Sequence, residues 1–274
     1  MDLEYLFLVF VIWGGCIGGV IAAPIQLEGH FVQGGLVYGK TKLGAKVMVD
    51  GQSVRVSDKG FFLVGFGRDA NSQTELAVEL ADGTRMRKLL KIAKRDYSVQ
   101  RITGLPPRKV KPIEQDMKRI HAEIAAVQKA RQRDDSRTNF LSGFVWPLKG
   151  RITGVYGSQR ILNGEPRRPH YGLDIAAPEG TPVRAPADGV VTLLHPDMYF
   201  SGGTLILDHG HGLSSSFLHL SKILVKKGQA IRQNEVIAEV GATGRVTGAH
   251  LDWRVNLFQA RLDPQLLVTS MSAP

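Results

Sequence analysis

Three short polar motifs in the second half of the chain hold the residues best suited to chemistry. They are residues 170–174 (His-Tyr-Gly-Leu-Asp), 217–220 (Phe-Leu-His-Leu) and 250–253 (His-Leu-Asp-Trp), and together they supply three histidines and two aspartates. A catalytic zinc site needs about three nitrogen or oxygen ligands, one open position for water and a nearby group that moves protons. The motifs therefore predict a metal-dependent hydrolase.

The last motif has the pattern of a half-buried strand. His250, Asp252 and Arg254 alternate with apolar residues. Residues i and i+2 of a strand share a face, so the three polar side chains are expected to project into one space while the other face enters a core. A surface strand with a solvated face would show the same alternation, so this motif alone does not define a site.

The first motif is expected on a loop that runs into a strand. His170 and Asp174 are four residues apart, but Pro169 and Gly172 argue against a helix. This pair is also a weak signal by itself. A third histidine, His219, occurs in a defined sequence context, and the three motifs together are a strong signal for a metal-dependent site.

Beyond these motifs, the chain from residue 144 to about residue 263 resembles the lysostaphin- or LytM-type zinc endopeptidases of bacterial peptidoglycan. The matching stretches follow the family's order and fall at residues 146–153, 156–160, 170–175, 180–183, 187–191, 217–221 and 243–251. The resemblance covers a little under half of the chain. It implies an antiparallel β domain in which one sheet floors a groove for an extended wall peptide.

The resemblance also implies roles for single residues. Zinc would be bound by His170 and Asp174 of the first motif. The final strand would supply a catalytic histidine, His250, followed by the third metal ligand, which falls on Asp252. His219 would be the second catalytic histidine. The family usually has histidine where this chain has Asp252.

The departure at Asp252 keeps a side chain that can bind a metal. Carboxylate oxygen binds zinc at about 2.0–2.2 Å, and aspartate reaches about as far as the near nitrogen of histidine. Two carboxylates would neutralise the ion's charge and make it a weaker Lewis acid. The harder ligand set moves preference slightly toward Mn²⁺ or Fe²⁺, with zinc still expected. We therefore expect an active metalloendopeptidase, with the division of labour between His219 and His250 left open.

Three other polar residues have two interpretations each. His209 and His211 have attractive His-x-His spacing, but residues 208–212 are typical of a turn between strands, which favours a structural role. Arg160 matches a recurrent family position and could contact a substrate carboxylate or form a structural ion pair.

The composition favours an anionic partner in the cell envelope. The 274 residues carry a net charge of +10, with a pI near 9.8. A basic protein suits any polyanion, but no Cys-x2-Cys or helix-turn-helix motif points to nucleic acid. Anionic material of the cell envelope is therefore the better partner. The family resemblance implies that this partner is peptidoglycan, and other envelope proteins could join it. The lone cysteine, Cys16, lies in the leader, so no disulfide is expected in the folded part.

The first 23 residues predict a signal peptide or a membrane anchor. Residues 5–25 form an uncharged, mostly apolar run, and Ala22 and Ala23 offer a site for signal peptidase. The acidic start and Pro24 fit cleavage less well, and the run is long enough to span a membrane. Either interpretation places the catalytic part outside the cytoplasm, in the periplasm or secreted, with inner-membrane anchoring as the alternative to cleavage.

The chain as a whole predicts a mainly β fold with four further parts. Residues 24–103 contain short β-rich runs separated by turn signals at residues 50–51, 58–60 and 82–83, typical of a small immunoglobulin-like β-sandwich. Residues 104–138 form a Pro-rich break and a linking helix. Residues 139–268 form the metallopeptidase domain, rich in strand-like runs, and residues 269–274 form a tail.

The linking helix is predicted from an apolar stripe. Its members recur at spacings of four and three: Ile113, Met117, Ile120, Ile124 and Val127. The stripe is short for a coiled coil, so packing on a flanking domain is expected. Residues 129–137 are charged and are expected to be a solvated linker.

Two other classes of function remain. A non-catalytic envelope protein of the same fold could bind peptidoglycan or activate another wall hydrolase, and metal content with wall digestion would separate it from an enzyme. The turns at residues 187–191 and 225–237 are similar to those of a lipoyl- or biotinyl-type carrier. A carrier needs a lysine at a hairpin tip between them, where this chain has His209, His211 and His219.

Overall fold

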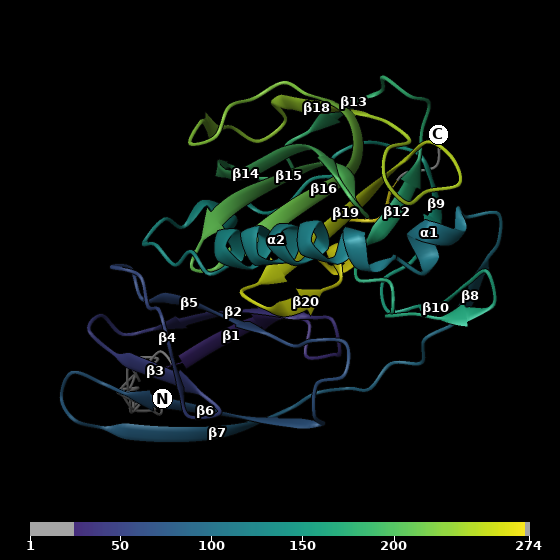
Figure 1. Ribbon diagram of the computed structural model, residues 1–274. Coiled ribbons are helices and arrows are strands. Elements are labelled where there is room, and N and C mark those ends of the chain that lie inside the picture. Colours follow the sequence, from purple (N-terminus) through teal and green to yellow (C-terminus); the bar gives the residue numbers. More distant parts are fainter. Residues whose placement is uncertain (1–24, 272–274) are drawn as a thin grey trace, which may run out of the picture.

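The computed structural model describes residues 25–271 (Figure 1). The predicted leader, residues 1–23 with Cys16, and the last residues of the predicted tail, 272–274, lie outside this range. The described chain is mainly β, as predicted, with a β-rich C-terminal part. In residues 25–271, no helix combines the length and the apolar character needed to cross a membrane.

The N-terminal part contains two small antiparallel sheets around one core. Val37 and Phe62 from one sheet cluster with Val47 and Leu76 from the other. The first sheet has the order β1 (Ile25–Gly29), β2 (Leu36–Thr41), β5 (Phe61–Gly65), and the second has the order β4 (Gln52–Val54), β3 (Lys46–Val49), β6 (Gln73–Glu79), β7 (Arg85–Lys91). The predicted Asp-Gly turn is present: Asp50 and Gly51 both have positive φ and connect β3 to β4.

The next strand leaves these sheets and joins the C-terminal part. Strand β8 (Val99–Ile102) pairs in parallel with β10 (Gln159–Leu162), which also pairs with β11 (Glu165–Pro166). Residues 99–102, at the end of the predicted module 24–103, therefore share a sheet with the C-terminal part. Helices α1 (Pro107–Val110) and α2 (Glu114–Arg131) follow.

Helix α2 packs on the C-terminal part through a face that only partly matches the predicted stripe. Ile120 is buried and Val127 packs against a cluster on the large sheet, as predicted. Ile113 and Ile124, by contrast, are 44% and 45% exposed.

Polar residues complete the buried face of α2. Asp116 is buried and accepts two hydrogen bonds of 2.7 Å from Arg108. The prediction that residues 129–137 form a solvated linker is wrong for Arg131, which is 5% exposed and donates to Ser216 Oγ at 3.1 Å. The sheet beneath the helix is partly polar, so a guanidinium finds a partner there that apolar periodicity does not register.

The C-terminal part is built on one ten-stranded antiparallel sheet. Its main path runs β17-β14-β15-β16-β19-β12-β9, and β13, β18 and β20 attach to it. The strands are β9 (Arg151–Gly154), β12 (Leu173–Ala176), β13 (Pro182–Arg184), β14 (Gly189–Met198), β15 (Gly202–Gly210), β16 (Leu213–Ile223), β17 (Ala230–Ile231), β18 (Val236–Val240), β19 (His250–Leu257) and β20 (Ala260–Leu262), flanked by short 3-10 helices η1 (Asn139–Ser142) and η2 (Pro264–Leu267).

Strand β19 divides its side chains as its alternation predicts. Leu251, Trp253 and Val255 have no exposed surface and belong to the main hydrophobic core. Trp253 pairs in register with Phe217 and Leu173 of the neighbouring strands. A cross-strand set of large apolar side chains on one face anchors β19, and its polar residues must then project from the other face.

Helix α2 covers part of that second face. In the cross-strand register, Ser216 of β16 lies opposite both Ile206 of β15 and Arg254 of β19, so the three share a face. Ile206 is in the cluster that Val127 of α2 contacts. Figure 1 shows α2 running across strands β14 to β19. The part of this polar face that lies under α2 is therefore covered by the helix.

Candidate metal centre

Strand pairing brings two acidic residues together. Asp174 of β12 lies directly opposite Asp252 of β19 in the antiparallel ladder, and directly opposite residues share a face with their Cβ atoms about 5 Å apart. His170 arrives from the loop before β12, as predicted. Its backbone N–H donates to Ser158 O at 2.8 Å and its carbonyl accepts from Gly157 N at 2.7 Å, which positions the ring beside the two carboxylates.

These three buried side chains fit a divalent metal ion. His170, Asp174 and Asp252 each offer a ligand atom, and these atoms lie within 4.8 Å of one another. His170 Nε2 is 3.1 Å from Asp174 Oδ1, close to the roughly 3.4 Å that separates two ligands of a tetrahedral zinc ion. Apart from this contact with each other, the ring nitrogens of His170 and Oδ1 of Asp174 have no hydrogen-bond partner. Buried polar atoms without partners are rare. The cluster therefore combines the ligand types of a metal site with atoms that are free to bind an ion.

Each carboxylate of the cluster also contacts a guanidinium. Asp174 Oδ2 accepts from Arg160 Nη2. Asp252 accepts from Arg254 Nε at 2.9 and 3.1 Å and from its Nη2 at 2.5 Å. Of the two interpretations of Arg160, the geometry therefore favours the ion pair.

Both carboxyl groups are held ionised at neutral pH. Burial would raise the pKa of Asp174, but His170 and Arg160 outweigh it and leave the pKa below its ordinary value. Burial would also raise the pKa of Asp252, but Arg254 and His170 outweigh it and hold the pKa far below the usual range. Sequence reasoning assigned Arg254 no role, although its place two residues after Asp252 on a strand was the available signal.

The first predicted catalytic histidine, His219, is held in an unusual backbone conformation. It lies within β16 with a φ of 66°, a left-handed region that non-glycine residues rarely occupy. Its backbone N–H donates to Ser201 O at 2.8 Å, and its Nδ1 lies 2.8 Å from Thr243 O. Strain of this kind persists where surrounding contacts impose it, and it is frequent at functional sites.

The two predicted catalytic histidines lie side by side. The ring centroids of His219 and His250 are 4.9 Å apart, and His250 Nε2 is 3.7 Å from Asp174 Oδ1. His250 Nδ1 lies 2.9 Å from Gly248 O. In both rings a carbonyl oxygen faces Nδ1, which places the proton there and leaves Nε2 as an acceptor. Burial lowers the pKa of His219 to about 4, so that its imidazole is neutral at pH 7.

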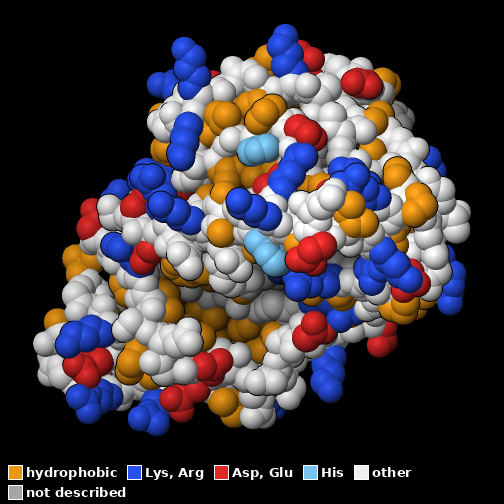
Figure 2. Space-filling view, in the orientation of Figure 1, with side chains coloured by type: hydrophobic (Ala, Val, Ile, Leu, Met, Phe, Trp, Pro, Cys, Tyr) orange, Lys and Arg blue, Asp and Glu red, His pale blue; other side chains and the backbone are white. Residues whose placement is uncertain are grey.

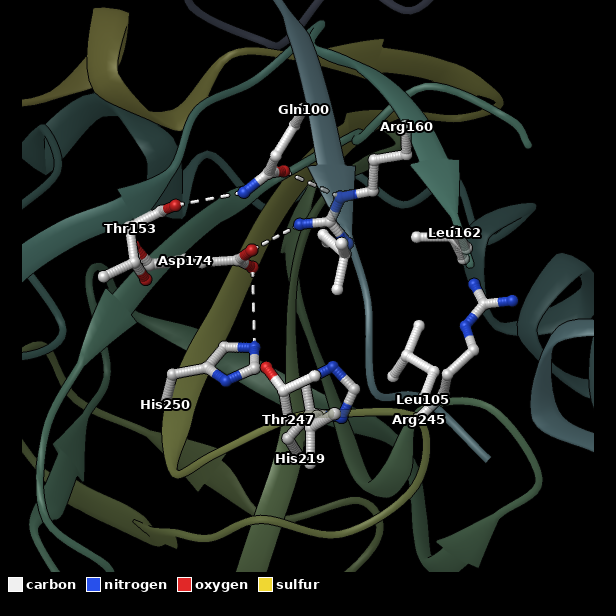
Figure 3. Close-up of a pocket in the computed structure, with 12 residues that line it drawn as sticks. Gln100, Leu105, Thr153, Arg160, Leu162, Asp174, His219, Arg245, Thr247 and His250 are labelled. Atoms are coloured by element: carbon white, nitrogen blue, oxygen red, sulfur yellow. Dashed lines mark hydrogen bonds and ion pairs between the residues drawn. The ribbon is translucent and has the colours of Figure 1, made fainter. Parts of the chain in front are cut away.

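A pocket of about 150 Å³ opens beside these histidines (Figure 3). Asp174, His219 and His250 form part of its lining, and Gln100 and Leu105, from β8 and the segment after it, line it as well. The sequence motifs locate the first three residues. They give no indication of the last two, because β8 reaches the site only through its parallel pairing with β10.

His209 and His211 do not join the candidate centre. His209 is fully buried, with Nδ1 2.6 Å from Asp188 O and Nε2 2.9 Å from Ser215 Oγ. The predicted turn is shorter than expected: His211 and Gly212, with positive φ, make it, and His209 is still in β15. The structure thus gives His209 a buried structural position, as predicted.

The buried His209 leads to a prediction about acid stability. Burial lowers its pKa to about 4 in the folded protein, against about 6.5 when unfolded. Between these values only the unfolded chain binds the proton, so this contribution to stability is complete above pH 6.5 and is lost as pH falls toward 4. We expect the His209→Gln variant to show a pH dependence of the unfolding free energy that is shallower by about 1.4 kcal/mol per pH unit in that window.

Denaturant unfolding from pH 7 to pH 4.5 measures these slopes. The exposed His121 provides a matched control for the replacement of a histidine by glutamine. Parallel curves for the parent and His209→Gln would refute the assignment of a depressed pKa to His209.

The fold and the cluster define a β-rich protein with a candidate catalytic metal centre, and comparisons identify its family. Residues 168–264 match the model of Peptidase family M23. A solved structure of an M23 peptidase from Pseudomonas aeruginosa is 31% identical, with a TM-score of 0.66, and the match covers 86% of this chain and 94% of that chain. The chain belongs to peptidase family M23, which confirms the resemblance predicted from the motifs.

Curated relatives share the same region. The peptidoglycan DD-endopeptidases ShyA and ShyB of Vibrio cholerae are 43% and 45% identical over 110 and 122 residues, which is 39% and 44% of this chain. A Haemophilus influenzae protein named as a metalloprotease is 31% identical over 208 residues, or 72% of this chain. The matched segments cover 25%, 26% and 43% of these three relatives, so this chain spans less than half of their length.

Proposed function

We propose that this protein is a metal-dependent endopeptidase that hydrolyses peptide cross-links or stem peptides of bacterial peptidoglycan. The observation that carries the proposal is the buried trio of His170, Asp174 and Asp252 beside the paired rings of His219 and His250. Within the trio, the ring nitrogens of His170 and Oδ1 of Asp174 make no hydrogen bond outside the cluster. Two relatives named as peptidoglycan DD-endopeptidases support the class of substrate.

The trio would hold one divalent ion, with zinc favoured over Mn²⁺ and Fe²⁺. When bound, zinc polarises a carbonyl oxygen and makes water a nucleophile near neutral pH. Two carboxylates alone would neutralise much of the ion's charge, as the sequence suggested. Here Arg160 and Arg254 each share the negative charge of one carboxylate. The ion pairs therefore offset the expected loss of Lewis acidity.

His219 and His250 would move the protons. In both rings the carbonyl oxygen at Nδ1 leaves Nε2 able to accept a proton. The buried His219 stays neutral at physiological pH. One ring can take a proton from the attacking water, and a protonated ring can stabilise the oxyanion or supply the proton that the leaving amine needs. The hydrogen bonds at Nδ1 fix both rings in position for this exchange.

We place the protein in the cell envelope outside the cytoplasm. The predicted leader of residues 1–23 and the proposed substrate both favour this location, with cleavage or inner-membrane anchoring of the leader as the two routes. Lys and Arg side chains are numerous on the face of the C-terminal part that carries α2, interspersed with other side chains (Figure 2), which suits an anionic polymer. The proposed division is a β-sandwich module at 24–103, a helical linker at 104–138, a peptidase domain at 139–268 and a tail. The last strand of the proposed module, β8, pairs with β10 of the peptidase domain.

Digestion of purified peptidoglycan tests the proposal. The metal-loaded protein should convert cross-linked fragments into monomers, seen by mass spectrometry, and a chelator should reduce the rate at least about 100-fold until zinc is returned. The His121→Gln variant serves as a preparation control, because His121 is exposed and belongs neither to the pocket lining nor to the ligand cluster. Undiminished digestion by metal-free protein would refute the metal assignment, and no digestion by metal-loaded protein would favour a non-catalytic envelope function.

A further inference from the structure

Arg245 is a cation in the pocket without an acidic partner. It follows β18 and lines the pocket together with His219 and His250. Its guanidinium lies over the ring of Phe200, 4.6 Å from the centroid, and makes one long hydrogen bond of 3.4 Å from Nη1 to Lys109 O. Across residues 25–271, no carboxylate forms an ion pair with Arg245.

The other two arginines near the centre are paired. Arg160 contacts Asp174 and Arg254 contacts Asp252. The pKa of Arg245 is lowered to about 10, first by burial and then by Arg160, Arg254 and Arg167. A half-buried cation among like charges is costly to the fold unless an anion compensates it. A ligand that brings its own negative charge would remove this cost.

The walls of the pocket are suited to such a ligand. Ile102, Leu105 and Leu162 supply apolar lining, and Figure 3 draws the Arg245 guanidinium beside Leu162, across the pocket from His250. Apolar walls strengthen an ion pair because they lower the local dielectric. A volume of about 150 Å³ is enough for a group the size of a six-carbon ring. The pocket therefore takes about one residue of a peptide.

We propose that Arg245 is a specificity residue that binds a free carboxylate on the substrate residue next to the cleaved bond. This subsite rests on the proposed endopeptidase function and names its substrate class. The substrate is a peptide in which the residue at the scissile bond keeps an unblocked carboxylate, as the cross-linking carbon of a diamino diacid does. The interior of a polyglycine bridge has no such group and is excluded.

Two matched peptides test the subsite on the full-length, zinc-loaded protein. They share one sequence and differ only in a carboxylate or a carboxamide on the residue after the scissile bond. The parent protein should cleave the carboxylate form with a kcat/KM roughly 10- to 100-fold higher, the range expected for a charged hydrogen bond. Arg245→Gln should lose this preference, mainly through a higher KM, and Arg245→Lys should keep part of it.

Controls separate a subsite from a structural role. Arg101→Gln removes an exposed arginine of β8 that does not line the pocket, and it should keep the full preference. The melting temperature of Arg245→Gln should be unchanged or higher, because the variant removes an unpaired cation. Equal cleavage of both peptides by the parent, or an equal loss on both in Arg245→Gln, would overturn the subsite and leave the endopeptidase function standing. If the zinc-loaded parent cleaves neither these peptides nor peptidoglycan, the proposed function itself is wrong.

Discussion

Replacing Asp252 with histidine will weaken metal retention and stability unless Arg254 is neutralised in the same chain. Histidine is a sound zinc ligand, but the change removes the carboxylate whose two oxygens accept from Arg254. Asp252 is fully buried and the Arg254 side chain is 23% exposed. A guanidinium without its partner would then repel the ion. We expect the folded protein to lose about 3 kcal/mol and the metal affinity to fall roughly 10- to 100-fold.

A double variant gives this prediction its control. Asp252→His with Arg254→Gln removes the orphaned cation and should recover most of the stability and metal content that Asp252→His loses. Asp252→Ala should lose metal and activity together. Thermal unfolding and elemental analysis after dialysis report both quantities. If Asp252→His alone retains metal and melts like the parent, Asp252 and Arg254 do not act as a pair.

The second large effect is expected at His219, where His219→Asn should lower kcat by about 10²- to 10⁴-fold while metal content stays constant. Asparagine suits this position because it tolerates the left-handed conformation that the φ of 66° requires. Its side-chain amide can still donate to Thr243 O, which now faces Nδ1. The variant thus removes the proton acceptor and keeps the local fold.

Rates on peptidoglycan and elemental analysis measure this effect. His250→Asn provides a second test of the histidine pair, and His121→Asn, at an exposed position, should match the parent. Parent-like turnover in His219→Asn would remove His219 from the catalytic assignment. Loss of metal from the same variant would instead indicate that the ring supports the ligand cluster.

Local patterns in the sequence were enough to predict most strands and to name the residues of the candidate site. The alternation through Asp252 and Trp253 specified which side chains enter the core, because a strand has a period of two residues. Asp-Gly at residues 50–51 predicted a tight turn, because these residues tolerate positive φ. The motif resemblance linked His170 to residues about 80 positions later, and the ladder between β12 and β19 confirms that these segments are adjacent.

Charge compensation and the walls of the pocket were decided only by the tertiary structure. Asp252 and Arg254 are close in sequence, but the pairing of Arg160 with Asp174, the burial of Arg131 and the unpaired state of Arg245 depend on contacts between distant segments. Strand β8 likewise reaches the site through its pairing with β10. Sequence periodicity indicates which side chains of one segment face the core and which face solvent. Which charged side chains form ion pairs depends on the pairing of segments and on the exclusion of water, and those are properties of the assembled fold.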